Sequence, residues 1–114
     1  MSRMPDPGQL DRMFFALSDA NRRHMLERLS AGPTSVTELG QPLGIAMSSV
    51  VKHLAVLESG GLVESDKAGR VRTYRVAPGA FAAMEKWVAA HKTRLNAQFD
   101  RLDAYLAGKK TRKS

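Results

Sequence analysis

The sequence contains no cysteine, which excludes disulfide bonds, thiolate metal sites and cysteine nucleophiles. It also contains no apolar run that approaches the roughly 18 residues of a membrane-spanning helix. The opening segment, MSRMPDPGQL, lacks the apolar stretch of a secretory signal peptide. From these absences we expect a cytoplasmic protein that makes no contact with a membrane.

Acidic residues are also few, since 11 Asp and Glu stand against 18 Lys and Arg and leave a net charge of +7. This excess of positive charge favours a polyanionic partner, either nucleic acid or an anionic membrane, and charge alone does not choose between them. The 114 residues and the hydrophobic content of 43% fit one compact domain. We expect a flexible tail at residues 1–8, a folded domain at 9–107 and a basic tail at 108–114.

The spacing of apolar residues predicts two helices at the start of the folded domain. Apolar positions recur there at intervals of three and four. They are Leu10, Met13, Phe14 and Leu17 in the first helix and Met25, Leu26 and Leu29 in the second. Ser18 or Asp19 can cap the second helix, because a short side-chain oxygen accepts hydrogen bonds from the unpaired N–H groups at a helix start.

Two more helices follow the Gly32-Pro33 break. Ser35 and Glu38 have the spacing of a capping box, which predicts a short helix that runs through Leu43. A fourth helix is expected over Met47–Ser59, with a glycine pair after it to end the helix. These two helices are close enough in sequence to form a helix-turn-helix pair.

A β-hairpin and a long helix complete the predicted fold. The runs 62–65 and 71–76 have strand character, and the glycine-containing segment 66–70 joins them. The cations of this hairpin are Lys67, Arg70, Arg72 and Arg75. The apolar seam of the last helix consists of Met84, Val88, His91, Leu95, Phe99, Leu102 and Leu106. Such a seam is too long for a small monomer to bury, so we expect it to meet a partner subunit.

The order of these elements predicts a mainly α-helical winged helix-turn-helix with four helices, a two-stranded wing and a final helix. This arrangement suits duplex DNA, because a helix fits the major groove and a cationic hairpin can lie along phosphates. The expected DNA-binding residues are Ser48, Ser49, Lys52 and His53 on the fourth helix and Lys67, Arg70 and Arg72 on the hairpin. His53 precedes an apolar position, so packing beneath the helix stays open as its alternative role.

The stretch from Leu17 to Val76 resembles the ArsR-type transcriptional regulators. The most specific matches are Leu17-Ser18-Asp19 with Arg22-Arg23, the segment 48–57 and Gly69-Arg70 before Tyr74. The resemblance implies a homodimeric repressor on a two-fold symmetric operator, with its first and last helices at the dimer interface. The interface residues expected on this basis are Met13, Phe14, Leu17, Val88, His91, Leu95, Phe99 and Leu102.

The departures from the family pattern argue against a metal sensor. Many relatives bind metal through a Cys-Val-Cys segment, whose cysteines correspond to Ser35 and Thr37 here. Others use paired Asp and His residues on the final helix, which here has only His91. We therefore expect neither a metal nor a cofactor. Relatives usually carry serine where this chain has Ala46 and Val51, which points to a shifted sequence preference.

No enzyme motif is found. The three histidines have no recognisable nucleophile motif beside them, and the glycines do not form a phosphate-binding loop. Two alternatives to a DNA-binding repressor without a ligand remain open. One is a winged helix that binds protein or structured RNA, and the other is a regulator with a small-molecule inducer near Met84, Trp87 and Phe99.

Overall fold

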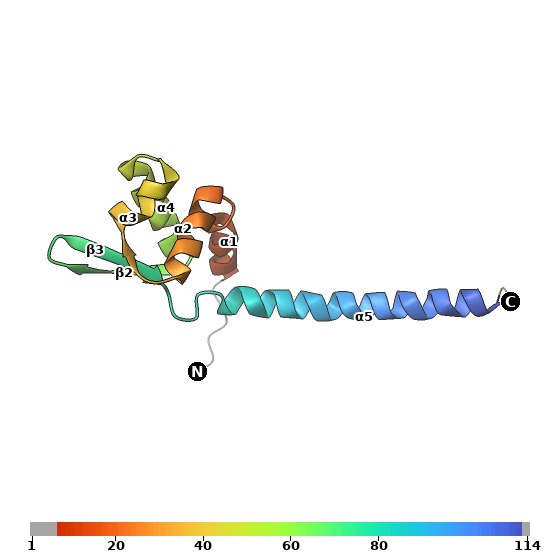
Figure 1. Cartoon of the computed structure of the whole chain (residues 1–114). Helices are drawn as coiled ribbons and strands as arrows, with labels where there is room; N and C mark the ends of the chain where they lie inside the picture. The colour runs from red at the N-terminus through yellow and green to blue at the C-terminus, as the bar shows by residue number, and fades with distance from the viewer. Residues whose placement is uncertain (1–6, 113–114) are drawn as a thin grey trace, which may run out of the picture. The chain divides into compact units, whose positions relative to one another are not determined.

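The computed structural model describes residues 7–112, with side chains described from residue 8 to residue 108. The described chain forms two compact units, one that ends at Ala83 and one that begins at Met84. The elements are α1 (Pro7–Ala16), α2 (Ala20–Ser30), β1 (Thr34–Ser35), α3 (Val36–Gly40), the 3-10 helix η1 (Gln41–Leu43), α4 (Met47–Ser59), β2 (Val63–Ala68), β3 (Val71–Val76) and α5 (Ala82–Arg112) (Figure 1). The predicted mainly α-helical winged helix-turn-helix is confirmed.

The core of the first unit is formed by the apolar faces of its helices together with the base of the wing. The largest buried side chains are Met13, Met25, Val50, Leu54, Leu57 and Leu62. Met13 has no exposed surface at all in the single chain, because it lies on the inner face of α1. The expectation that Met13 forms part of a dimer interface is therefore wrong, and this residue stabilises the fold instead. Phe14 and Phe15, on the outer side of the same helix, are exposed.

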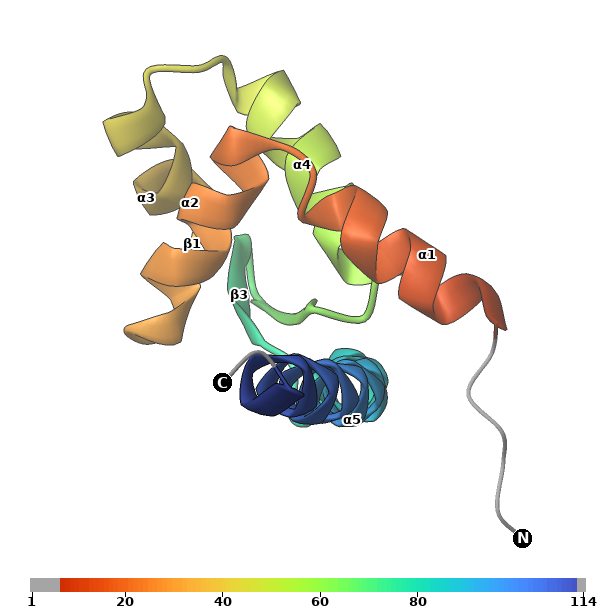
Figure 2. The same cartoon turned by 90° about the vertical axis from the view of Figure 1, so that its right-hand side faces the viewer.

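The helix-turn-helix pair is held at a fixed distance by a glycine. A Cβ atom added to Gly40 would lie 2.7 Å from Cγ2 of the buried Val50, so only glycine permits this approach of α3 to α4. The chain then turns through Gly44, whose φ of 64° lies in the left-handed region. Figure 2 shows this turn at the edge of the helical unit, with α4 running from it into the interior. The core residues thus fix the position of α4.

The wing differs in detail from the expected hairpin. The strands extend further than predicted, because Asp66, Lys67 and Ala68 all pair with β3, and only Gly69 and Arg70 form the turn. Gly69 has a φ of 62°, which fits a two-residue type II′ turn. A short strand not predicted from the sequence, β1, pairs with the other edge of β3 and completes a sheet of order β1-β3-β2.

The last helix is longer than the apolar seam alone suggested. α5 begins at Ala82 and continues to Arg112, so residues 108–112, expected in the basic tail, are helical. Lys and Arg have high helix propensities, and their presence does not end a helix. At the other end, residues 7 and 8 of the expected tail belong to α1. The rest of the two predicted tails, residues 1–6 and 113–114, lies outside the described residues.

Candidate nucleic-acid interface

α4 presents a mixed polar and apolar row to solvent. Ser48 and Lys52, four residues apart, are exposed, and Val51 between them is 50% exposed. Ser49 and His53 are half-buried at the border between this row and the core-facing row. The four predicted DNA-binding residues of the helix therefore lie along one side of it, with His53 closest to the protein interior.

The start of α4 has no side-chain cap. Ala46, at the N-cap, has extended backbone angles, and its methyl side chain makes no capping hydrogen bond. Its carbonyl accepts hydrogen bonds from Ser49 and Val50, so the helix ladder begins there. The positive end of the helix dipole thus lies beside Ser48 and Ser49, without a carboxylate in the first turn. An anion that approaches this end is stabilised.

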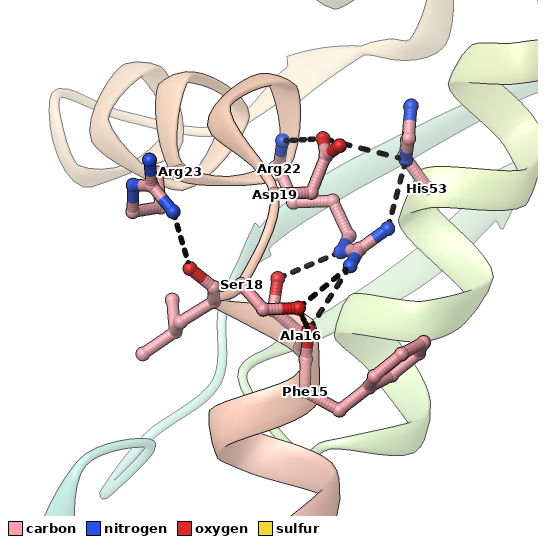
Figure 3. Close-up of polar contacts among 8 residues, drawn as sticks. Phe15, Ala16, Ser18, Asp19, Arg22, Arg23 and His53 are labelled. Carbon is pink, nitrogen blue, oxygen red and sulfur yellow. Dashed lines mark hydrogen bonds and ion pairs between the residues drawn. The ribbon is translucent and has the colours of Figure 1, made fainter.

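Arg22 is an organising residue that sequence reasoning missed as a site residue. Its side chain is buried and donates hydrogen bonds from Nε to the carbonyl of Ala16 at 2.7 Å and from Nη2 to that of Phe15 at 3.0 Å. Nη1 lies 3.2 Å from Nδ1 of His53 (Figure 3). Arg22 on α2 therefore joins the end of α1 to α4. The sequence carried one signal for this residue. Arg22 belongs to one of the segments that most specifically resemble the ArsR-type regulators, Leu17-Ser18-Asp19 with Arg22-Arg23.

Asp19 completes this cluster. Its carboxylate accepts a hydrogen bond from the backbone N–H of Arg22 at 3.1 Å, which confirms the predicted cap of α2. That hydrogen bond lowers the pKa of the Asp19 carboxyl, and the positive charges of Arg22 and of His53, when its ring is protonated, lower it further against a partial desolvation. His53 Nδ1 lies 3.9 Å from Asp19 Oδ2, so His53 is held toward α2 on its Nδ1 side.

The two faces of the wing carry different charge. Lys67 and Arg72 are directly opposite each other on β2 and β3, both exposed, and Arg72 donates a hydrogen bond to Ser65 at 2.8 Å. Side chains alternate between faces along a strand, so Arg75 lies on the other face. There it forms ion pairs with Glu64, at 2.9 Å, and with Asp66.

These pairs change the charge that each face offers. Hydrogen bonds to Asp66 and Glu64 raise the pKa of Arg75, and the bond from Arg75 lowers the pKa of Asp66. The positive charge of Arg75 is therefore compensated within the wing. Arg70, at the turn, is exposed. Within the described part of the chain, the uncompensated cations of the wing are the three that the sequence predicted as DNA-binding residues.

α5 carries its apolar seam on the surface. Val88, Leu95, Phe99 and Leu102 are 46–58% exposed in the single chain. His91 is half-buried within the helix surface, where its Nδ1 lies 2.9 Å from the carbonyl of Trp87 and its ring stacks on the indole at 4.0 Å between centroids. Phe14 of the other expected interface helix is exposed as well, and Leu17, just after the end of α1, is half-buried.

Metal-binding clusters and membrane-spanning helices are both absent from the described residues. No group of three or more His, Asp or Glu side chains among them is arranged to hold a metal ion. None of the described helices has the length and apolarity to cross a membrane.

Comparison with known proteins agrees with this geometry. A family model described as a helix-turn-helix domain matches residues 17–66. The HTH-type transcriptional regulator Rv2034 of Mycobacterium tuberculosis is 40% identical over 74 residues, which cover 65% of this chain and 69% of that protein. The crystal structure of an ArsR family transcriptional regulator has 41% identity and a TM-score of 0.73, covering 77% of this chain and 97% of that one.

A solution structure from Mycobacterium bovis is similar over a longer part of the chain. It is described as a homodimeric winged helix-turn-helix DNA-binding domain of a possible ArsR-family regulator. It has 25% identity and a TM-score of 0.62, and the match covers 86% of this chain and 95% of that one. The fold, the α3–α4 pair and the wing therefore define a DNA-binding transcriptional regulator, a class without enzymatic activity. Within this class, the chain belongs to the ArsR family.

Proposed function

We propose that this chain is a sequence-specific repressor that binds duplex DNA as a homodimer and does not respond to metal. In this proposal, α4 enters the major groove and the wing holds the flanking phosphates. The observation that carries it is the exposed row of donors on α4, Ser48 and Lys52, on a helix fixed by three fully buried residues. A rigid helix with short polar side chains along one side is suited to contact base edges.

The contacts of α4 divide by chemistry. Ser48, Ser49 and Lys52 can donate hydrogen bonds to base edges or phosphates, and the uncapped helix start favours a phosphate near them. Val51, exposed between Ser48 and Lys52, has no hydrogen-bonding group. An apolar side chain in the major groove contacts the methyl group of thymine. We therefore expect a thymine opposite Val51 in the preferred site.

The wing supplies phosphate contacts. Like charges directly opposite on neighbouring strands destabilise a sheet, so the pair of Lys67 and Arg72 is unfavourable on its own. A phosphate between or beside the two side chains removes this repulsion. Arg70 extends the same positive surface to the tip of the hairpin, which projects beyond α3 and α4 in Figure 1. The three side chains hold the protein on DNA without regard to sequence.

The apolar seam of α5 supports the homodimer. Seven large apolar side chains of α5, from Trp87 to Leu106, are more than 40% exposed, and an apolar surface of this extent favours association. A two-fold dimer places two α4 helices in successive major grooves about 34 Å apart. Such a dimer bound over a promoter excludes RNA polymerase, which is the simplest route to repression.

The proposal is tested by selection of genomic duplex fragments that bind the protein, followed by competition with random DNA. The triple variant S48A/S49A/K52A is expected to lose about 1–3 kcal/mol of preference for the selected site for each base that it no longer contacts. Matched controls are S59A, at the other end of α4, and K92A, which removes one positive charge from α5. Both controls should keep the preference.

Two results would contradict the proposal. If random duplex DNA or structured RNA abolishes binding to the selected site, the alternative of a module that binds protein or structured RNA is favoured. A reproducible tenfold change in affinity on addition of stoichiometric zinc would contradict the absence of metal response, because a ligand shifts binding only through different affinity for the two states.

A further inference from the structure

We propose that Arg22 is a positioning residue that fixes the tautomer of His53 and so directs the Nε2–H group of His53 outward as a hydrogen-bond donor to a DNA phosphate. This inference rests on the proposed function for its last step, the contact with DNA. Its first step, the tautomer, is a property of the protein alone. The observation behind it is the contact of 3.2 Å between Arg22 Nη1 and His53 Nδ1.

The guanidinium of Arg22 has little freedom to move. Only 8% of the residue is exposed. In addition to the two carbonyls at the end of α1, Nη2 lies 3.4 Å from Ser18 Oγ, and the guanidinium carbon lies 5.1 Å from the centre of the Phe15 ring. These contacts come from one short segment of the chain, 15–18, which anchors the group. Nη1 is therefore held toward α4.

The chemistry of the pair then determines where the imidazole proton lies. A guanidinium stays protonated in proteins and has donors but no acceptor. His53 Nδ1 must therefore be the acceptor in this hydrogen bond. A neutral imidazole that accepts at Nδ1 carries its proton at Nε2. The nearby carboxylate of Asp19 does not reverse this assignment, because it lies 3.9 Å from Nδ1 and already accepts the backbone N–H of Arg22 at 3.1 Å.

The Nε2 atom is on the outer side of the ring. Figure 3 shows the second nitrogen of His53 pointing away from both Arg22 and Asp19. The His53 side chain is 20% exposed, so its edge is accessible while its ring is supported. Ser49 lies four residues earlier, which places both side chains on the same side of α4. An N–H group fixed in this position is suited to a phosphate oxygen.

The tautomer is tested first on the protein without DNA. Nitrogen-15 NMR of the histidine rings at neutral pH is expected to show His53 with a protonated Nε2 and an unprotonated Nδ1. In Arg22→Lys, checked for folding by circular dichroism, the shorter reach of the amine is expected to give a mixture of both tautomers. A protonated Nδ1 in the wild type, or an unchanged single tautomer in a folded Arg22→Lys, would overturn the inference.

The outward donor is tested with two substitutions of His53 itself. Asparagine places its amide oxygen near the position of Nδ1, whereas glutamine carries its NH2 group out toward the position of Nε2. H53N keeps the acceptor for Arg22, so its melting temperature is expected to equal that of the wild type. It is expected to bind the selected DNA about tenfold more weakly, because a hydrogen bond to a charged group is removed. H53Q is expected to bind about tenfold more tightly than H53N.

Equal affinities of H53N and H53Q would overturn the role of the Nε2–H donor. If the wild type shows no binding to duplex DNA at all, the proposed function fails, and the NMR result still decides whether Arg22 fixes the tautomer. The two failures are thus distinguishable.

Discussion

The ionised carboxylate of Asp19 contributes to stability in a pH range that its hydrogen bond defines. Because the Arg22 N–H and the neighbouring positive charges lower its pKa in the folded chain, the contribution is complete above the carboxyl's usual value, near pH 4. It disappears as the pH falls through the lower, folded-state pKa. We predict that D19N lowers the melting temperature at pH 7 and that the difference from wild type shrinks below about pH 4. Glu27→Gln, on the exposed side of α2, is the matched control and should show no such trend.

A difference between D19N and wild type that is constant from pH 7 to pH 2 would contradict the charge-based explanation. The difference would then have to arise from the capping geometry of the Asp19 side chain, although asparagine largely reproduces that geometry.

The contact of Gly40 with Val50 makes a prediction about packing between α3 and α4. Alanine at position 40 is compatible with the helical backbone there, so any destabilisation arises from the 2.7 Å approach of its Cβ to Val50 Cγ2. Overpacking of this kind costs about 1–3 kcal/mol of the free energy of unfolding. G108A in α5, where an added Cβ meets nothing within 4 Å, should be neutral or slightly stabilising. Denaturation in urea measures both.

A double variant isolates the steric contact. V50A removes the methyl group that clashes, so G40A should cost less in the V50A background than in the wild type. Equal costs in the two backgrounds would contradict the explanation.

Arginines that are alike in sequence have different roles in the structure. Arg22 is buried, Arg75 is paired with two acids, and Arg72 is exposed. The net charge predicted a polyanionic partner, but it could not assign these roles. One hydrogen-bond partner of Arg22, His53, lies 31 positions away, and the partners of Arg75 depend on the strand register. Neither is visible to reasoning from local spacing.

At the scale of elements, the wing is expected to supply affinity and α4 to supply selectivity. R70A/R72A should weaken binding to the selected site and to random DNA alike. It should also flatten the slope of log affinity against log salt by about one unit for each phosphate that the variant no longer binds. The matched control is E64A/R75A, which removes both ion pairs of Arg75 and leaves the wing's net charge unchanged. Its salt slope should equal that of the wild type.

A salt titration of both variants on both DNAs checks this division. If R70A/R72A is no longer selective and the α4 variant still is, the roles are reversed and the wing is the sequence-specific element.

The elements that could be predicted are those with strong local signals. α4 has the predicted bounds, because a regular apolar row and a terminal glycine pair define it. The cap of α2 and the N-cap of α3 at Ser35 were also predicted correctly, since capping depends on residues three positions apart. β1 was missed because two residues carry no periodicity, and only their pairing with Thr73 and Tyr74 makes them a strand. The basic composition of residues 108–114 predicts a tail and places the end of α5 too early, because Lys and Arg do not by themselves end a helix.

At the scale of the whole molecule, the helix-turn-helix unit buries its apolar core within one chain, whereas α5 carries exposed apolar side chains. The first unit buries its own apolar faces, including Met13, which was wrongly expected in an interface. The wrong expectation has a physical reason, because a helical repeat identifies the apolar face of α1 but not whether a core or a partner covers it. For α5, the exposed apolar side chains support the proposal that a partner subunit covers them.

The dimer prediction follows from that exposed seam. Leu95 lies near its middle and is 50% exposed in the single chain, so L95D introduces a charge into the surface that we propose two chains share. Burial of an unpaired carboxylate is costly, so the variant should be a monomer at micromolar concentration, where we expect the wild type to sediment as a dimer. A97D places the same charge on the opposite, exposed side of α5 and should stay dimeric.

The affinity for DNA gives a second measurement of the same dimer. Two linked half-site contacts raise affinity far above that of one half-site contact, so L95D should bind a two-fold operator no more tightly than a single half-site. A97D should keep its higher affinity for the two-fold operator. A monomeric wild type would contradict the dimer and the two-fold operator together, and a dimeric L95D would move the interface away from this seam.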